Sequence, residues 1–216
     1  LGVFLPFIAL YIRDILDDKV KTRLDLENTS DVPFLGDVPS SLSSDQLMEL
    51  ESRSSAAEAI RIIRTNLEFM LSSTSKTKCK TIFTTSTLPG EGKTFICANL
   101  AATIALSNKK VLLIGMDLRN PKIKEYINVP TRGFTNFLIE GDKPIEEFII
   151  KVPNYTHFDV LPSGIIPPNP VELLIDERVE TTFEYLKSKY DYILVDTAPV
   201  APVTDTLLIS KFADLF

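Results

Sequence analysis

The sequence of 216 residues is poor in the side chains that build metal centres and disulfide frameworks. It contains one histidine, His157, and two cysteines, Cys79 and Cys97, and none of them lies in a C-x-x-C or Cys/His spacing. A zinc module and a disulfide-stapled secreted domain are therefore excluded. Tryptophan is absent, but hydrophobic residues make up 44% of the chain, so its length and composition suit a globular protein with a full-sized core.

The chain also lacks an excess of positive charge. Lys and Arg number 23 against 29 Asp and Glu, which gives a formal net charge of −6 and a pI near 4.9. Binding to a nucleic-acid backbone requires clustered Lys and Arg, so we expect no nucleic-acid partner. No G-x-G-x-x-G sequence follows a predicted strand, which disfavours a dinucleotide-binding dehydrogenase.

The apolar run at the start of the chain is shorter than a membrane-spanning helix. Residues 1–12 carry no charge, but a helix of that length spans only about 18 Å, whereas a crossing needs roughly 20 residues. Four basic residues follow between positions 13 and 23, as on the cytoplasmic side of membrane helices. We therefore interpret residues 1–23 as the end of a transmembrane helix with its juxtamembrane segment. Because the first residue is Leu rather than Met, we expect the sequence to be a fragment of a longer protein. The alternative is an ordinary core helix at a domain edge.

The rest of the chain divides into a linker and one large domain. Residues 24–45 are rich in Ser, Asp and Pro and show no sustained apolar period, so we expect a linker there. We assign residues 46–216 to a single domain whose C-terminal end is truncated. Its first helix is indicated by apolar residues three and four positions apart, namely Ala56, Ile60, Ile63, Leu67 and Met70.

Short apolar runs and helical periods then alternate along this domain. We expect strands at 80–86, 110–116, 158–161 and 192–195, and helices over 92–107, from Asn169 and from about Val203. Residues 213–216 have the pattern of a further strand. The alternation predicts an α/β fold with a doubly wound, mostly parallel sheet in a three-layer sandwich.

Residues 87–94, between the first predicted strand and the helix after it, match a phosphate-binding loop. The run TLPGEGKT fits G-x-x-x-x-G-K-[ST], with Thr87 in place of the first glycine. Gly90 and Gly92 allow backbone amides to turn toward a polyphosphate at the positive end of the helix. Lys93 would reach the β- and γ-phosphates, and the Thr94 hydroxyl would ligate Mg²⁺. A glycine turn followed by an accidental Lys-Thr is disfavoured by the strand–loop–helix setting.

Two further predicted strands end near acids. Residues 192–196 are four apolar residues followed by Asp196, the Walker B form, in which the acid holds Mg²⁺ directly or through water. A second apolar strand ends near Asp117 and Arg119. One such acid can be merely a helix cap, but three features at the carboxyl edge of one parallel sheet predict a nucleotide and metal site.

These motifs, in this order, resemble those of bacterial tyrosine kinases (BY-kinases), which belong to the membrane-linked polysaccharide co-polymerases that govern capsule and exopolysaccharide export. Residues 24–39 also resemble the juxtamembrane segment of that family. The resemblance to the Walker A, A′ and B motifs and their companions is carried by STLPGEGKTFICAN (86–99), DLRNP (117–121), DTAP (196–199), GIIPPNPVELL (164–174) and Glu58-x-x-Arg61-x-x-Arg64.

The resemblance implies an ATP-dependent transfer to a tyrosine hydroxyl. It implies Lys93, Asp117 and Asp196 as catalytic residues, and Thr94, Asp117 and Asp196 as the Mg²⁺ ligands. The implied ATP or ADP site comprises Pro89, Gly90, Glu91, Gly92, Lys93, Thr94, Phe95 and Arg119. The family substrate is a cluster of tyrosines in a C-terminal tail.

One position departs from the family pattern. The family's A′ motif usually has two acids, I-D-x-D-x-R, and Gly115 stands at the first of them. We therefore expect either that Asp117 serves alone or that the rate is low. Gly115→Asp is expected to raise the rate or to leave it unchanged, unless the new side chain crowds the metal.

The resemblance also implies partners. Glu58, Arg61 and Arg64 match the family's inter-subunit motif, which builds a ring that phosphorylates itself in trans. Spacing alone would predict only a solvated helix face with an i,i+3 ion pair. The implied location is the cytoplasmic side of the bacterial inner membrane, with the polysaccharide export machinery as a partner. Two alternatives remain: a ParA- or MinD-like ATPase, which would carry an extra Lys where this chain has Leu88, and a catalytically weak, nucleotide-gated scaffold.

Overall fold

The computed structural model describes residues 4–16, 23–40, 47, 54–74 and 78–216, and these fall into two units, residues 1–36 and 37–216. The predicted boundary between residues 45 and 46 lies outside the described residues. The division into residues 1–23, 24–45 and 46–216 therefore stays a prediction.

The first unit contains two helices, α1 (Phe4–Ile15) and α2 (Arg23–Thr29). α2 was not expected, because its sequence has no apolar period. It is supported by an ion pair between Arg23 and Glu27, 2.7 Å apart, and by the Arg23 guanidinium, which lies 4.9 Å from the centre of the Phe34 ring. Among the described helices, none combines the length and the apolar character needed to cross a membrane. The apolar side chains of α1 are exposed, and they include Phe4, Phe7, Ile8, Leu10, Tyr11, Ile12 and Ile15.

The second unit is built on a five-stranded sheet in the order β1-β5-β2-β4-β3. Four strands are parallel, and the edge strand β3 is antiparallel to β4. The strands are β1 (Lys80–Thr84), β2 (Val111–Gly115), β3 (Ile150–Lys151), β4 (Phe158–Leu161) and β5 (Tyr192–Asp196). The four predicted strands are confirmed, although β1 ends at Thr84, before the phosphate loop, and β3 was missed. Near the C-terminus, Leu215 forms a single parallel bridge to Ile82, and the Asp214 amide donates to the Thr81 carbonyl at 2.8 Å.

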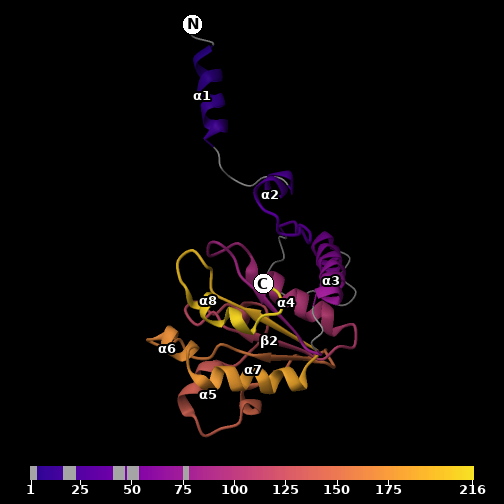
Figure 1. Ribbon diagram of the computed structural model, residues 1–216, viewed down its shortest axis with the longest axis vertical. Coiled ribbons are helices and arrows are strands. Elements are labelled where there is room, and N and C mark those ends of the chain that lie inside the picture. Colours follow the sequence, from indigo (N-terminus) through magenta and orange to yellow (C-terminus); the bar gives the residue numbers. More distant parts are fainter. Residues whose placement is uncertain (1–3, 17–22, 41–46, 48–53, 75–77) are drawn as a thin grey trace. The chain divides into compact units, whose positions relative to one another are not determined.

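Helices cover both faces of this sheet, which makes the predicted three-layer, doubly wound arrangement (Figure 1). On one face lie α4 (Lys93–Ala105) and, packed against it, α3 (Ser55–Thr74). On the other face lie α5 (Phe134–Glu140), α6 (Pro170–Leu174), α7 (Glu177–Lys189) and α8 (Asp205–Ile209). Three short 3₁₀ helices, η1 (Ile123–Glu125), η2 (Ile145–Phe148) and η3 (Ser210–Phe212), connect these elements. The sequence did not predict α5.

The core follows the period of two in the strands. Phe83, Ile114 and Val195 belong to the cluster that packs against α5, α7 and α8. Their neighbours in each strand point to the other face, against α4. α4 is buried between the sheet and α3, so Cys97 is fully buried, as expected of a core residue. The architecture therefore brings the carboxyl ends of β1, β5 and β2 together at one edge, next to the amino end of α4.

Candidate active site

The phosphate loop connects β1 to α4 and is held in an open turn. Gly90 and Gly92 have φ angles of 89° and 88°, in the left-handed region that side chains rarely adopt. The Glu91 carboxylate accepts hydrogen bonds from the backbone amides of Thr87, at 2.9 Å, and of Leu88, at 3.1 Å. The predicted loop residues Pro89 and Glu91 are exposed, and no Cβ clash would arise at either glycine. The glycines are therefore required by backbone conformation, which is what a polyphosphate cradle needs.

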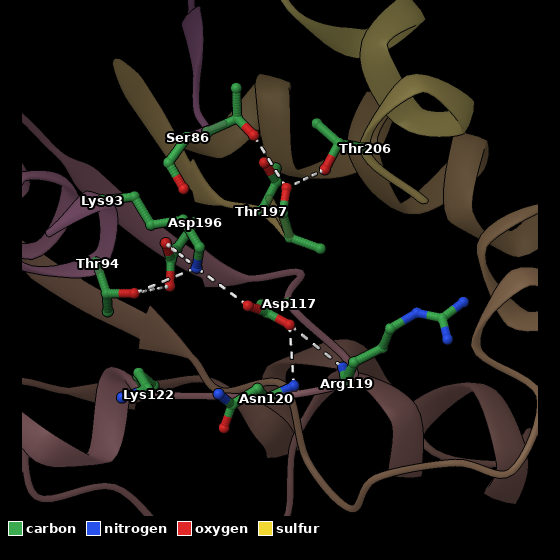
Figure 2. A network of polar contacts seen from close by, with 12 residues as sticks. Ser86, Lys93, Thr94, Asp117, Arg119, Asn120, Lys122, Asp196, Thr197 and Thr206 are labelled. Carbon is green, nitrogen blue, oxygen red and sulfur yellow. Dashed lines mark hydrogen bonds and ion pairs between the residues drawn. The ribbon is translucent and has the colours of Figure 1, made fainter. Parts of the chain in front are cut away.

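Lys93, at the start of α4, lies among the acids that end the neighbouring strands (Figure 2). Its Nζ is 3.0 Å from Asp117 Oδ2 and 3.3 Å from Asp196 Oδ1. The Thr94 hydroxyl donates to Asp196 Oδ2 at 2.8 Å. All four side chains are buried, with at most 8% of the Lys93 and acid side chains exposed. The structure therefore brings the predicted catalytic and metal-binding residues into one cluster.

Backbone amides fix the second acid of this cluster. Asp117 Oδ1 accepts from the amide of Asn120 at 3.0 Å and from that of Arg119 at 3.3 Å. The amides of Met116 and Asp117 donate to the Asp196 carbonyl, at 2.8 and 3.0 Å. The two acids are thus held at fixed positions at the carboxyl ends of the adjacent strands β2 and β5.

Two buried carboxylates share one ammonium, so the cluster carries an uncompensated negative charge. Burial raises the pKa of Asp196 to about 6, although Lys93 and Thr94 act to lower it. Burial also acts to lower the pKa of Lys93, but the two carboxylates outweigh this effect and its pKa lies above the ordinary value. Lys93 therefore stays protonated, and an additional cation would stabilise the ionised acids.

The side chains present fit a bound Mg²⁺–nucleotide. Mg²⁺ in such sites takes one or two carboxylates and completes its coordination with substrate phosphates and water. In the part of the chain that the structure describes, no group of three or more His, Cys, Asp and Glu could hold a metal by itself. The ion would therefore need Thr94, Asp117 and Asp196 together with phosphate oxygens.

Two predicted nucleotide-binding side chains have partners inside the protein. The Arg119 guanidinium forms two hydrogen bonds with the buried carboxylate of Asp205, at 2.7 and 3.0 Å, and points away from Lys93 (Figure 2). The ring of Phe95 lies 6.0 Å from that of Tyr126. The Asp205 partner was not identified from the sequence, since it lies 86 residues beyond Arg119.

Residues near Gly115 were also missed. A Cβ built on Gly115 would lie 2.4 Å from Ser163 Oγ. Gly115 is the register partner of Asp196 on β5, and Ser163 follows β4 on the other side. The space that a side chain at position 115 would need, where the family usually has an acid, is therefore occupied here by a serine from the segment after β4. Nothing in the local pattern around either residue indicates this contact.

The predicted assembly residues lie on α3 and differ in their surroundings. Glu58 and Arg61 form an exposed ion pair at 3.0 Å. Arg64 is half-buried, and it donates to the Thr103 carbonyl of α4 at 3.3 Å and lies 3.4 Å from Glu68. The Glu58–Arg61 pair thus lies at the surface of α3, whereas Arg64 also packs α3 onto α4.

Comparisons with known proteins identify relatives of this chain. A family model described as an AAA domain matches residues 79–211. Tyrosine-protein kinase YwqD of Bacillus subtilis (strain 168) is 38% identical over 165 residues, which cover 76% of this chain and 68% of that protein. Tyrosine-protein kinase ptk of Acinetobacter johnsonii is 30% identical over 225 residues, 98% of this chain.

The structure comparison gives the same result. The kinase domain of the Escherichia coli tyrosine kinase ETK superposes with a TM-score of 0.78 at 29% identity, over 90% of this chain and 80% of that one. The chain spans only 30% of the length of the Acinetobacter protein, so it corresponds to a part of such relatives. With its P-loop NTPase-like fold and these relatives, the chain belongs to the family of bacterial tyrosine-protein kinases.

Proposed function

We propose that the chain is an ATP-dependent protein-tyrosine kinase domain, which regulates the synthesis and export of a capsular polysaccharide or exopolysaccharide. The observation that carries this proposal is the buried cluster in which Lys93 contacts both Asp117 and Asp196 beside the phosphate loop. The names of the relatives, tyrosine-protein kinases, support the same reaction.

Phosphoryl transfer depends mainly on positioning and on neutralising charge. The amides of the phosphate loop and Lys93 would hold the β- and γ-phosphates. Lys93 would exchange its carboxylate partners for phosphate oxygens, since Mg²⁺ supplies the positive charge that the two acids then need. Asp117 would accept the proton of the attacking tyrosine hydroxyl, because Gly115 leaves no second acid on β2.

We propose that the tyrosines belong to a neighbouring copy of the same protein in a ring-like homo-oligomer. Such a ring would be held at the bacterial inner membrane, with the domain on the cytoplasmic side and in contact with the export machinery. The exposed apolar side chains of α1 support a membrane attachment, as does the basic residue Arg13 in its last turn.

The test is phosphotyrosine formation on a tyrosine-rich peptide with MgATP. We expect phosphotyrosine with the wild-type chain and none with Asp196→Asn or Asp117→Asn. ADP production without phosphotyrosine would instead favour a ParA- or MinD-like ATPase. Nucleotide binding with neither product would favour the scaffold, for which the absence of an acid at Gly115 is the supporting observation.

A further inference from the structure

A cavity of about 350 Å³ lies at the amino ends of the strands, whereas the phosphate loop lies at their carboxyl ends. Lys110, His157 and Tyr190 border it, and they lie just before β2, β4 and β5. The cluster of Lys93, Asp117 and Asp196 instead lies at the carboxyl ends of β2 and β5, so the two sites are separate. The volume lies within the range of about 300–1,000 Å³ that is typical of small-molecule sites.

Three lysines surround this cavity, in a chain whose net charge is −6. Lys110 precedes β2, Lys151 lies on the edge strand β3, and Lys189 ends α7. Within the described residues, none of the three ammonium groups forms an ion pair with a carboxylate. Lys189 Nζ instead lies 5.1 Å from the centre of the Tyr185 ring. The hydrogen bond from Tyr185 and, to a smaller extent, the charge of Lys189 lower the pKa of Glu146. The lining holds three lysines and two carboxylates, so it offers a small excess of positive charge to an anionic group.

Two carboxylates in the same cavity wall face two tyrosines. The Tyr190 hydroxyl donates to Asp159 Oδ2 at 2.8 Å, and the Tyr185 hydroxyl donates to Glu146. A carboxylate has about four acceptor positions, so each acid keeps room for further donors. The cavity thus combines hydrogen-bond acceptors, aromatic rings and cations.

We propose that this cavity binds a monosaccharide that carries a phosphate or a carboxylate group. The lysines would hold the anionic group, the two carboxylates would accept hydrogen bonds from the sugar hydroxyls, and the tyrosine rings would pack against the sugar ring. An inorganic anion would use only the lysines. A phosphotyrosine side chain has no hydroxyl groups on its ring for Glu146 and Asp159 to accept from. This inference does not depend on the proposed kinase activity.

The test is isothermal titration calorimetry of the 216-residue chain with glucose 1-phosphate at fixed ionic strength. We expect glucose 1-phosphate to bind at least tenfold more tightly than either glucose or inorganic phosphate. Lys110→Ala/Lys151→Ala should weaken this binding at least tenfold. The matched control Lys78→Ala/Lys211→Ala also removes two positive charges, but neither residue lines the cavity, so binding should be unchanged. Tyr185→Phe, which keeps the ring, should weaken binding less than Tyr185→Ala.

Several results would overturn the proposal. They are equal affinity in the wild type and the lysine double variant, affinity for inorganic phosphate equal to that for glucose 1-phosphate, and tighter binding of a phosphotyrosine peptide. Loss of binding in Lys93→Met, with the fold retained by circular dichroism, would place the sugar phosphate at the phosphate loop instead. If the double variant does not fold, the single variant Lys151→Gln gives the same comparison, because Lys151 is exposed on an edge strand.

Discussion

Ser163 occupies the space in which a side chain at position 115 would begin. A Cβ on Gly115 would lie 2.4 Å from Ser163 Oγ and 2.9 Å from the Ser163 amide nitrogen. The serine is itself held in place, because its carbonyl accepts a hydrogen bond from the Thr135 amide at 2.9 Å. The glycine therefore allows the segment after β4 to approach β2. The glycine at this departure from the family motif therefore has a packing role.

We expect Gly115→Ala to lower the free energy of unfolding by about 1–3 kcal/mol, as is usual for overpacking in a closed site. Gly115→Asp should lower it further, because a carboxylate would be added beside a buried acid pair. The expectation that Gly115→Asp raises the rate or leaves it unchanged, unless the new side chain crowds the metal, stays a prediction, and a loss of stability is expected beside it. Urea denaturation followed by circular dichroism measures the effect.

Ser163→Gly provides the matched control for this contact. In the Gly115→Ala background it should restore part of the lost stability, because it removes the 2.4 Å contact with Oγ but not the 2.9 Å contact with the backbone nitrogen. If the Gly115→Ala protein is as stable as the wild type, the segment after β4 can shift to accommodate the added Cβ without a loss of stability.

Lys93→Met should weaken nucleotide binding by about ten- to a hundredfold, the loss of one or two charge-assisted hydrogen bonds. The same substitution leaves Asp117 and Asp196 without their shared cation, so it should also lower stability. Calorimetry with MgADP and a thermal melt measure the two effects. Equal nucleotide affinity in both proteins would contradict the assignment of the phosphate loop.

The sequence was sufficient to predict the phosphate loop and both acids, because each lies in a short pattern at the end of a strand. The parallel sheet then brings these patterns together without further information. The Arg119–Asp205 and Gly115–Ser163 contacts could not be predicted in this way. Each joins residues dozens of positions apart, so their meeting depends on how the loops pack rather than on any local pattern.

The helices show the same limit. The period of α3 was predicted, and Ala56, Ile60, Ile63 and Leu67 are buried. α5 has only seven residues, too few to establish a period, and its amino end is fixed by long-range bonds from Phe134 and Thr135 to the carbonyls that follow β4. Tertiary contacts rather than local preference determine that helix.

Asp196 should make both stability and metal binding depend on pH near 6. Its pKa is raised from 3.8 to about 6 in the folded protein, so the folded state holds the proton more tightly than the unfolded chain does. The contribution of this carboxyl to stability is therefore present at low pH and is lost as the pH rises from about 4 to 6. Mg²⁺ needs the ionised form, so Mg²⁺-dependent nucleotide affinity should fall as the pH drops below about 6.

Asp196→Asn separates these two effects. At pH 7 the variant without nucleotide should be more stable than the wild type by about 1–3 kcal/mol, because it removes a buried charge that the cluster does not compensate. Its nucleotide affinity should respond less to the chelation of Mg²⁺ than that of the wild type, because one of the proposed ligands is lost. Lower stability of the variant at pH 7 would show that Asp196 is fully compensated by Lys93.

The last prediction concerns the exposed ion pair on α3. Glu58→Ala/Arg61→Ala should change the free energy of unfolding by less than about 0.5 kcal/mol, since exposed i,i+3 pairs contribute little. If these residues form an inter-subunit contact, the variant should associate more weakly in size-exclusion chromatography with light scattering over a range of concentrations. Arg64 is left intact, because its bond to the Thr103 carbonyl would mix a folding effect into the measurement.

Glu180→Ala/Lys211→Ala is the matched control for this experiment, because it removes one acid and one base from an exposed pair on the opposite face of the sheet. It should associate like the wild type. If the Glu58/Arg61 variant associates as strongly as the wild type, these residues take no part in assembly and form only a solvated helix face. If contacts through α3 were enough for assembly, oligomers would form at high concentration by mass action. A wild-type chain that stays monomeric at every concentration would therefore show that α3 alone does not drive assembly.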